Sequence, residues 1–524
     1  MTEPLHCLLD EPLVRLSLPG GDRHRVTLPE VLARLGSGED LDFTALRPHQ
    51  AHAWHAFLTQ LAAIALRRET DRSPKRRAGE WRRLLLKASG GRPEPWCLVV
   101  SDAAQPALLQ PPAAEGSLDD YRLLARTPDD IDVLVTAKHH DVKYQMIAYP
   151  ELDHWLYALV NLQTTGGFTG RDNYGISRMN GGFASRPGVA ATGDLGWATR
   201  FQRDVQVWLE QEEALLGGAW GYRQNGLALV WLEPWDGLDS LPLRDLHPFY
   251  IEICRRIRLL EEAGALVAYY RPTKAPRVSA SQAMGNTGDV WTPIKKGEVA
   301  GAALTVGRAG FSYTLVQKIL AGHDFHLPDA LRLRDEDGQE PVMVAQALVR
   351  GQGKTDGWRE RHIPIARRAS GFFRTAEGRQ EIATVSARWV QEVATFRNYV
   401  LRPAVCALLQ AGAEKLDLRD KQADPWVQRL DPLVDEIFFD RLWNALGKEQ
   451  TAADGPFLLE VYRLARSILE EAIRSAPLPS IRRYRAITSA ERFFEGASRK
   501  HFGWLFETFS PTPGDATDDR RAEL

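Results

Sequence analysis

Residues 381–400 have the sequence EIATVSARWVQEVATFRNYV, and the character of the chain changes at this stretch. Its apolar side chains recur every three or four residues, the spacing that places them on one face of an α-helix. Pro403 follows and is expected to bend or end that helix. The apolar positions are Ile382, Val385, Trp389, Val393, Phe396 and Val400.

Three further stretches with the same spacing follow this helix. The second stops near Gly447, the third stops before Pro477, and the fourth starts near Ser480. Four amphipathic helices with short connections are typical of a bundle, so we predict a four-helix bundle over residues 376–509. Residues 510–524 are rich in Pro, Gly, Asp and Thr, which predicts a disordered tail. The apolar residues of the fourth helix include Ile481, Tyr484, Ile487, Phe493 and Phe494.

The part of the chain before this region has a mixed pattern. Short apolar strands such as 96–100 and 227–232 alternate with helices such as 49–68 and 249–262, and glycine-rich loops interrupt both. There is neither a repeat of fixed period nor a regular βαβ alternation. We therefore predict an α+β fold, with a large irregular N-terminal α+β domain over residues 1–375 followed by the four-helix bundle.

The bulk composition limits the classes of function. A chain of 524 residues is too long for one ordinary core, and its net charge of −2 argues against a free-standing DNA-coating protein. Cys7, Cys97, Cys254 and Cys406 are scattered without a Cys-x-x-Cys pair, which disfavours a disulfide framework or a cysteine zinc site and fits a reducing compartment. Neither a signal-peptide core nor an apolar run of about 18 residues is present, so we expect a cytoplasmic protein without membrane contact.

A glycine-rich segment at residues 163–175 has the sequence QTTGGFTGRDNYG. Glycine at this density marks a backbone that turns tightly or approaches another group closely. Arg171, Arg178 and Arg186, in and beside the segment, add donors suited to phosphates or base edges. The alternative is a flexible surface loop. A dinucleotide-binding fingerprint is excluded because the strand–turn–helix setting is missing.

Two basic segments stand out. The run between Arg67 and Arg83 is either a solvated loop or a patch that contacts phosphates. Lys274 lies in the loop RPTKAPR at residues 271–277, where the two prolines reduce the entropy that is lost when the loop is held in place. Taken alone, Lys274 would be a surface lysine.

A polar loop at residues 351–355, GQGKT, resembles part of a phosphate-binding P-loop. A P-loop needs a further glycine five residues before Gly353, and Leu348 occupies that position. We therefore expect a polar loop that projects Gln352 and Lys354 rather than an ATPase site.

Several histidines were considered as metal ligands. His49, His52 and His55 lie three residues apart on a predicted helix, a pattern that more often belongs to a polar helix face than to a metal site. The His-Asp pairs in 139–141 and 323–324 match one class of metal nuclease, but the further ligands of that class cannot be assembled here. We therefore predict no catalytic site, no metal and no cofactor.

Together these features resemble the CasA family, the large subunits of the type I-E CRISPR surveillance complex Cascade. The partial matches follow the family order over nearly the whole chain. Leu13 stands where the family usually has tryptophan, and the tip at 352–354 differs from the family's commonest Asn-Gln pair. The matching stretches are 8–13, 138–143, 163–170, Lys274 with 295–299, 352–354 with 358–362, and 438–442.

The resemblance implies contacts with the groove of a DNA duplex. Gly166, Gly167 and Gly170 would bring the backbone to the protospacer-adjacent motif (PAM) from the minor-groove side, where a groove about 6 Å wide admits little else. Lys274 would donate to minor-groove acceptors, which distinguish base pairs poorly.

The resemblance also assigns the two remaining groups of residues. Gln352 and Lys354 would form a wedge under the last base pair of the motif and start strand separation. Lys138, His140 and Lys143 would contact the guide RNA and neighbouring subunits. Some relatives carry a cysteine cluster in the middle of the chain, but only Cys254 is present there, so the resemblance implies no metal.

The expected partners are therefore double-stranded DNA, a CRISPR guide RNA, other Cascade subunits and a separate helicase–nuclease. Two alternatives stay open at this point. One is an enzyme, either a nucleotide hydrolase that uses the Lys354 loop or a metal nuclease that uses the His-Asp pairs. The other is a scaffold whose helical bundle only docks partners.

Overall fold

The computed structural model describes residues 5–132, 146–168, 172–181, 185–297, 301–351, 354–476 and 480–509. The chain divides into two compact units. Unit 1 comprises Met1–Phe311 and His323–Pro364, and unit 2 comprises Ser312–Gly322 and Ile365–Leu524. The domain limits expected from sequence differ from this division at 312–322 and at 365–375, both of which lie in unit 2. The tail expected at 510–524 lies outside the described residues.

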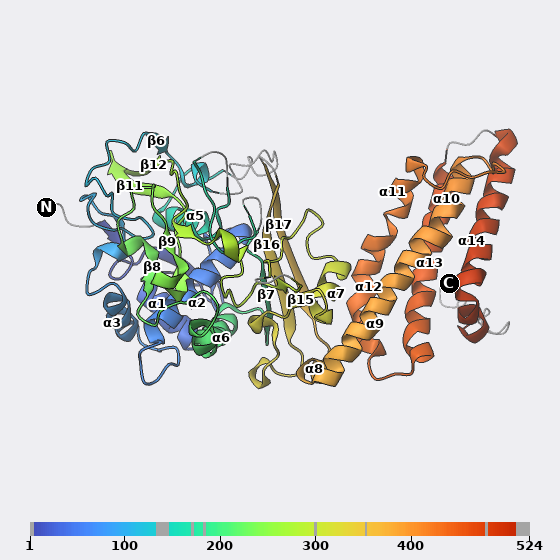
Figure 1. Cartoon of the computed structure of the whole chain (residues 1–524), viewed down its shortest axis with the longest axis horizontal. Coiled ribbons are helices and arrows are strands. Elements are labelled where there is room, and N and C mark those ends of the chain that lie inside the picture. Colours follow the sequence, from blue (N-terminus) through green and yellow to red (C-terminus); the bar gives the residue numbers. More distant parts are fainter. Residues whose placement is uncertain are drawn as a thin grey trace. The chain divides into compact units, whose positions relative to one another are not determined.

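Unit 1 is built on helices that share one apolar core (Figure 1). The helix predicted at 49–68 is confirmed as α2, Ala51–Leu66, and all of its residues except Ala51 are buried. A helix that is apolar on all sides is stable only in the interior, so α2 forms the centre around which the other helices pack. The other helices are α1 (Leu28–Gly36), α3 (Ala78–Ala88), α5 (Leu152–Thr165) and α6 (Trp197–Leu216).

The strands of unit 1 form several sheets of two or three strands, which confirms the irregular α+β character. The longest sheet has the order β17-β16-β7 and contains a long antiparallel hairpin (Figure 1). The strands are β1 (Leu5–Cys7), β2 (Val14–Ser17), β3 (Arg23–Val26), β4 (Asp42–Phe43), β5 (Cys97–Val99), β6 (Leu123–Ala125), β7 (Gly188–Thr192), β8 (Leu227–Leu229), β9 (Leu241–Pro242), β10 (Leu246–Ile251), β11 (Arg256–Glu262), β12 (Ala265–Arg271), β13 (Val278–Ser279), β14 (Ile294–Lys295), β15 (Phe325–His326), β16 (Val342–Gly351) and β17 (Lys354–Pro364).

The helix predicted at 249–262 is wrong. This stretch forms the end of β10, a short connection and β11. The backbone N–H groups of Cys254 and Arg255 both donate to Oε1 of Gln163, at 2.8 Å each. These donors are therefore taken by a side chain far along the sequence and are not available for helical bonds. Aromatic and β-branched residues on either side favour strands in that setting.

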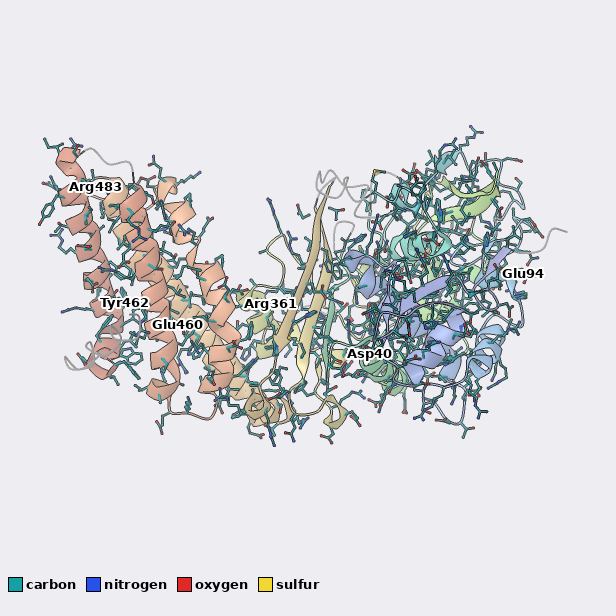
Figure 2. All side chains as sticks on the ribbon, turned by 180° about the vertical axis from the view of Figure 1, so that it is seen from behind. Asp40, Glu94, Arg361, Glu460, Tyr462 and Arg483 are labelled. Carbon is teal, nitrogen blue, oxygen red and sulfur yellow. The ribbon has the colours of Figure 1, made fainter. Side chains whose placement is uncertain are left out.

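Unit 2 is helical, which confirms the prediction for the C-terminal region (Figure 1). Trp389 lies at its centre, stacked on Phe457 with ring centroids 3.9 Å apart. Figure 2 shows the side chains of this unit, among them Tyr462, whose hydroxyl donates to Glu495 at 3.1 Å. The helices are α7 (Tyr313–Ala321), α8 (Arg367–Arg374), α9 (Ala376–Thr395), α10 (Arg402–Leu409), α11 (Asp424–Val427), α12 (Leu430–Ala445), α13 (Gln450–Ser475) and α14 (Ser480–Phe509).

Two details of unit 2 differ from the expected pattern. The helix does not end at Pro403, because a π-helical segment, Phe396–Leu401, joins α9 to α10. This wider turn precedes the proline, which then occupies the first turn of α10, where its missing N–H is tolerated. Ile481 and Tyr484 at the start of α14 are 93% and 83% exposed, so they lie outside the apolar core that they were expected to join.

Candidate functional site

The glycine-rich segment begins where α5 ends. A Cβ atom on Gly166 would lie 2.4 Å from the carbonyl oxygen of Leu162 and 2.9 Å from Sγ of Cys254. A Cβ atom on Gly175 would lie 2.8 Å from Cα of Gly167. Gly166 and Gly167 are themselves buried. The close approaches that require glycine at 166 and 175 are therefore contacts within the chain, and Gly170 lies outside the described residues.

One buried arginine holds the two ends of this segment together. Arg255 donates from Nη2 to the carbonyl oxygen of Gly167 at 2.7 Å, and its Nη1 donates to the carbonyl oxygen of Tyr174. The rings of Phe168 and Tyr174 lie 6.3 Å apart in an edge-to-face arrangement. Sequence reasoning missed Arg255 because nothing in its spacing links it to a segment about 80 residues earlier.

Arg178 and Arg186, which lie beside the segment, point inward. Their predicted use as donors to a nucleic acid is therefore wrong. Arg178 is 1% exposed and donates to the carbonyl oxygens of Pro248 and Tyr250, at 3.3 and 3.0 Å. Arg186 is also buried and donates to Asp289 at 2.7 Å. Arg178 thereby supplies donors to carbonyl groups of an irregular backbone, whereas Arg186 is bound by the side chains of Asp289 and Gln60.

The loop that carries Lys274 is joined directly to the glycine-rich segment. The backbone N–H of Thr273 donates to the carbonyl oxygen of Asp172 at 2.8 Å. The next residue, Lys274, donates its backbone N–H to Gly237 at 2.7 Å, and its side chain is exposed. The structure therefore brings an exposed lysine beside the segment. A cavity of about 540 Å³ is lined by Phe168, by residues between Tyr174 and Gly181, and by residues between Pro276 and Met284.

The hairpin β16–β17 is held near its turn. Leu162, in the last turn of α5, and Trp358, the register partner of Leu348, both pack against Leu348. Glu360 accepts hydrogen bonds from Gln346, from Trp358 at 3.2 Å and from His362 at 3.0 Å. The hydrogen bond from His362 is the largest cause that lowers the pKa of Glu360 to about 2.

The hairpin and the glycine-rich segment therefore both meet the C-terminal end of α5. At the turn of the hairpin Gly351 pairs with Lys354. Gln352 lies outside the described residues, and so do Lys138, His140 and Lys143. The structure therefore leaves the predicted roles of these residues, and of the Lys354 side chain, as predictions.

His52 and His55 of α2, and His49 in the 3-10 turn before it, are buried, so their expected position on a polar helix face is wrong. His49 and His55 pair with Asp132 and Asp204, each at 2.8 Å. Burial lowers the pKa of His52 to about 3, with a smaller contribution from the cation of Arg186. Among the described residues no group of three or more His, Cys, Asp or Glu side chains could hold a metal ion.

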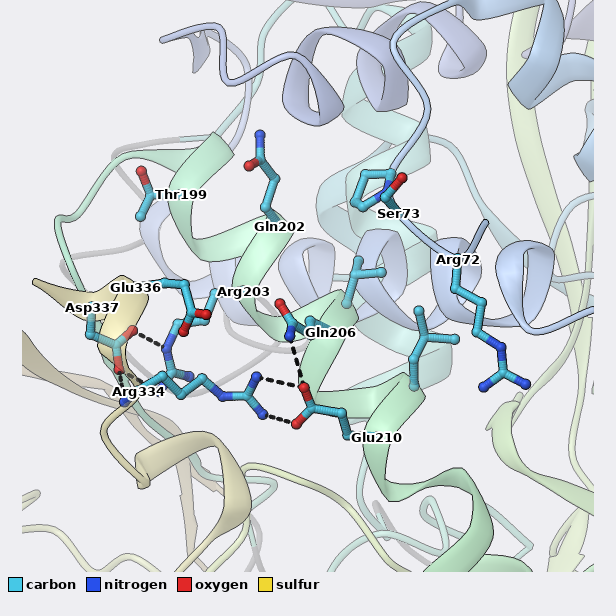
Figure 3. Close-up of a pocket in the computed structure, with 13 residues that line it drawn as sticks. Arg72, Ser73, Thr199, Gln202, Arg203, Gln206, Glu210, Arg334, Glu336 and Asp337 are labelled. Atoms are coloured by element: carbon cyan, nitrogen blue, oxygen red, sulfur yellow. Dashed lines mark hydrogen bonds and ion pairs between the residues drawn. The ribbon is translucent and has the colours of Figure 1, made fainter. Parts of the chain in front are cut away.

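The basic run between Arg67 and Arg83 is largely occupied by internal contacts. Arg82 pairs with Asp10, and Arg83 pairs with Glu69. Arg72 reaches Glu212 at 3.2 Å and lines the rim of a cavity of about 790 Å³ (Figure 3).

The charged side chains on the far wall of this cavity pair with one another (Figure 3). Arg334 donates from Nη1 to Glu210 at 3.0 Å, and Arg203 donates to Asp337 at 2.5 Å. These ion pairs join α6 to the segment that contains Arg334 and Asp337. The charged groups of this wall of the cavity are therefore paired with one another.

The protein therefore belongs to a class with two units. One is an α+β unit in which the glycine-rich segment and the Lys274 loop are hydrogen-bonded to each other, and the other is helical. No protein-family model matches the chain, and no curated protein matches it in sequence. Solved structures do match. The structure of Thermus thermophilus CasA (Cse1) is 15% identical, covers 94% of this chain and 99% of its own, and has a TM-score of 0.62.

Two further neighbours have the same name. Cse1 from Acidimicrobium ferrooxidans is 15% identical with a TM-score of 0.60, and the match covers 98% of this chain and 100% of that one. Thermobifida fusca Cse1 is 13% identical with a TM-score of 0.58, and the match covers 94% and 97%. The fold of this chain is the CasA (Cse1) fold. No helix among the described residues is long and apolar enough to cross a membrane.

Proposed function

We propose that this chain is the large subunit of a type I-E CRISPR Cascade surveillance complex, which recognises the PAM in double-stranded DNA. The observation that carries the proposal is the extent of the fold match, which spans 94–98% of this chain and 97–100% of each neighbour. A match of that extent includes both units, so the chain has the architecture of a whole CasA protein and not of one borrowed domain. The proposed role is binding rather than catalysis.

The proposed DNA-contacting surface consists of the glycine-rich segment and the Lys274 loop. The hydrogen bond from Thr273 to Asp172 supports it, because it couples the position of the lysine to that of the segment. Gly166 and Gly167 shape the start of the segment, since Gly166 accepts from Ile176 and Gly167 accepts from Arg255, and Gly170 supplies the close backbone approach to the minor groove. Lys274 donates to minor-groove acceptors.

The hairpin β16–β17 supplies the proposed wedge. Gln352 and Lys354 start strand separation at the end of the motif, and guide pairing then recovers the free energy of unstacking. The pairing of β16 with β7 and the packing of Leu348 against Leu162 support this use, because a wedge must not yield when it separates a base pair. Lys138, His140 and Lys143 contact the guide RNA and neighbouring subunits. The complex acts in the cytoplasm and recruits a separate helicase–nuclease.

The test is the replacement Lys274→Ala in a complex assembled with guide RNA and the other subunits. Loss of one charged hydrogen bond is expected to weaken binding to a motif-bearing duplex by roughly tenfold. Binding to a target that is already melted at the protospacer should change much less, because that substrate bypasses motif testing. Equilibrium binding by gel shift measures both affinities at one stated salt concentration.

Lys415→Ala provides the matched control, since Lys415 is also exposed but lies in unit 2. It should leave both affinities unchanged. An equal loss on the two substrates for Lys274→Ala would reduce the lysine to a general phosphate contact and contradict its role in motif recognition.

A further inference from the structure

Two of the four cysteines lie directly opposite each other in a sheet. Cys7 ends β1 and Cys97 begins β5, and the two residues are register partners in an antiparallel pair. The backbone N–H of Leu8 donates to the carbonyl oxygen of Trp96 at 3.0 Å. A hydrogen bond between the residues that flank a pair in this way identifies Cys7 and Cys97 as a non-hydrogen-bonded pair, the type in which side chains lie closest.

This position matches the covalent geometry of a disulfide. The Cα atoms of a non-hydrogen-bonded pair are about 4.5 Å apart, within the range of roughly 4.4–6.8 Å that disulfides span. The two side chains project from the same face of the sheet, and Cys7 packs against the small apolar cluster that contains Cys97. Both cysteines are free thiols in this structure. No large backbone movement is needed to bring the sulfur atoms together.

The environments of the two thiols differ in a useful way. Cys7 is half-buried and reachable from solvent, whereas Cys97 is 1% exposed. The Cys97 thiol donates to the carbonyl oxygen of Pro93 at 3.3 Å. A hydrogen bond between the Cys7 and Cys97 side chains is the largest cause that lowers the pKa of Cys7, although burial and the charges of Asp10 and Glu11 oppose the shift. The same hydrogen bond, with burial, raises the pKa of Cys97. Cys7 therefore has the character of an attacking thiolate and Cys97 that of a resolving thiol.

We propose that Cys7 and Cys97 form a thiol-oxidation site that closes reversibly to a cross-strand disulfide when a low-molecular-weight disulfide supplies the oxidant. The Cys7 thiolate attacks one sulfur of the oxidant, forms a mixed disulfide and releases the other half as a thiolate. Cys97 then loses its proton to solvent and attacks the Cys7 sulfur, which releases the second half. The two protein thiols are oxidised, and one molecule of oxidant is reduced to two thiols.

The bond would tie β1 to β5 and close a loop of about 90 residues between Cys7 and Cys97. The two other cysteines offer no such chemistry. The Cys254 thiol donates to the carbonyl oxygen of Leu162 at 3.1 Å, and Cys406 is fully buried in α10. The sequence spacing alone does not show the pair, because only the register of β1 against β5 brings the two residues together.

The experiment incubates the full-length chain with oxidised glutathione at mildly alkaline pH, blocks the remaining thiols with iodoacetamide and maps the peptides by mass spectrometry. The expected product is one peptide pair that joins Cys7 to Cys97, with the loss of two hydrogen atoms, and dithiothreitol should reverse it. The oxidised chain should also melt at a higher temperature than the reduced chain. A chain in which both thiols stay alkylated, or in which glutathione stays on Cys7, would overturn the proposal.

The variants separate the two roles. Cys97→Ser should trap glutathione on Cys7 as a stable adduct, because the resolving thiol is gone. Cys406→Ser, the matched control, should still form the Cys7–Cys97 bond. Absence of the adduct in a folded Cys97→Ser chain would contradict the assignment of Cys7 as the attacking thiol. Peptide mapping of the unaltered chain decides the matter by itself if Cys97→Ser fails to fold.

Discussion

The two units bury different kinds of side chain. Within the described residues unit 1 encloses many buried charges, among them Arg178, Arg203 and Asp204. Asp454 is the one buried Asp, Glu, Lys or Arg of the described part of unit 2, whose core is otherwise mainly aliphatic and aromatic with a few buried uncharged polar side chains. The difference follows from the backbone. Helices satisfy their own hydrogen bonds, whereas irregular loops need outside donors for their carbonyl groups.

Buried arginines supply many of these donors in unit 1. Arg258 donates to the carbonyl oxygens of Gln105 and Val100, and Arg277 donates to those of Glu233 and Pro234. A guanidinium group offers five N–H donors in a fixed plane, so one side chain can bind several strands of loop. The comparison teaches that unit 1 adds long-range polar bonds to its apolar core, whereas unit 2 relies mainly on apolar packing.

The largest effect is expected from Trp389→Ala in unit 2. The ring is fully buried, stacks on Phe457 and donates its indole N–H to Asp454 at 2.6 Å. Its removal leaves a cavity and takes one hydrogen bond from Asp454, which keeps its ion pair with Arg388. Together these losses should lower the free energy of unfolding by about 4 kcal/mol. Urea unfolding followed by the helical circular dichroism signal measures the change. Tyr484→Ala, at an exposed aromatic residue, should change it by less than about 0.5 kcal/mol.

A smaller effect, confined to unit 1, is expected from pH. His52 is neutral in the folded chain, with a pKa of about 3 against 6.5 as the ordinary value. The unfolded chain therefore binds a proton more readily, so the stability present above pH 6.5 is lost as the pH falls toward 3. Between pH 7 and pH 4 this residue should account for about 3 kcal/mol.

The measurement compares the slope of unfolding free energy against pH for the unaltered chain and for His52→Asn. The variant should have a shallower slope, and His24→Asn, at an exposed position of β3, should not. The same slope in all three chains would show that the buried charges of unit 1 are not coupled to pH through this histidine.

The smallest effect is expected where an arginine of unit 1 is exposed. Arg82 pairs with Asp10 at 2.7 Å, and both side chains are about half exposed. Because solvent and salt screen such a pair, Arg82→Ala should destabilise unit 1 by less than about 1 kcal/mol, and less still in high salt. Thermal unfolding measures the loss of stability. Arg203→Ala would leave the buried Asp337 without its ion-pair partner, and it should lower the stability several-fold more than Arg82→Ala does. Equal losses of stability for Arg82→Ala and Arg203→Ala would contradict the distinction between exposed and buried arginines.

The same contrast explains what the sequence could predict of the fold. The helices of unit 2 follow from local spacing, because residues such as Trp389 and Phe438 face the core of their own bundle. The fate of residues 249–262 depends on Gln163, whose amide oxygen takes two backbone donors from a distant part of the chain. No local pattern in residues 249–262 shows the contact with Gln163, so the sequence of this stretch predicts a helix where the chain forms strands.

The candidate site shows the same limit. The glycine-rich segment could be found from composition, whereas Lys274, which alone would be a surface lysine, was singled out only by the family resemblance. Their coupling through Thr273 and Asp172 could not, since it is a single backbone hydrogen bond. The inward direction of Arg178 could not be predicted either, because the sequence beside a glycine loop does not show whether an arginine faces solvent or the core.

The π-helical segment, Phe396–Leu401, limits how much the length of the continuous helix formed by α9 and α10 can vary. A π turn holds about one residue more than an α turn, and each residue of an α-helix advances the side chains by about 100°. The extra residue therefore sets the phase between the apolar face of α9 and that of α10. A chain shortened by one residue there would keep every hydrophobic side chain of both helices, yet present one half of them to the wrong side.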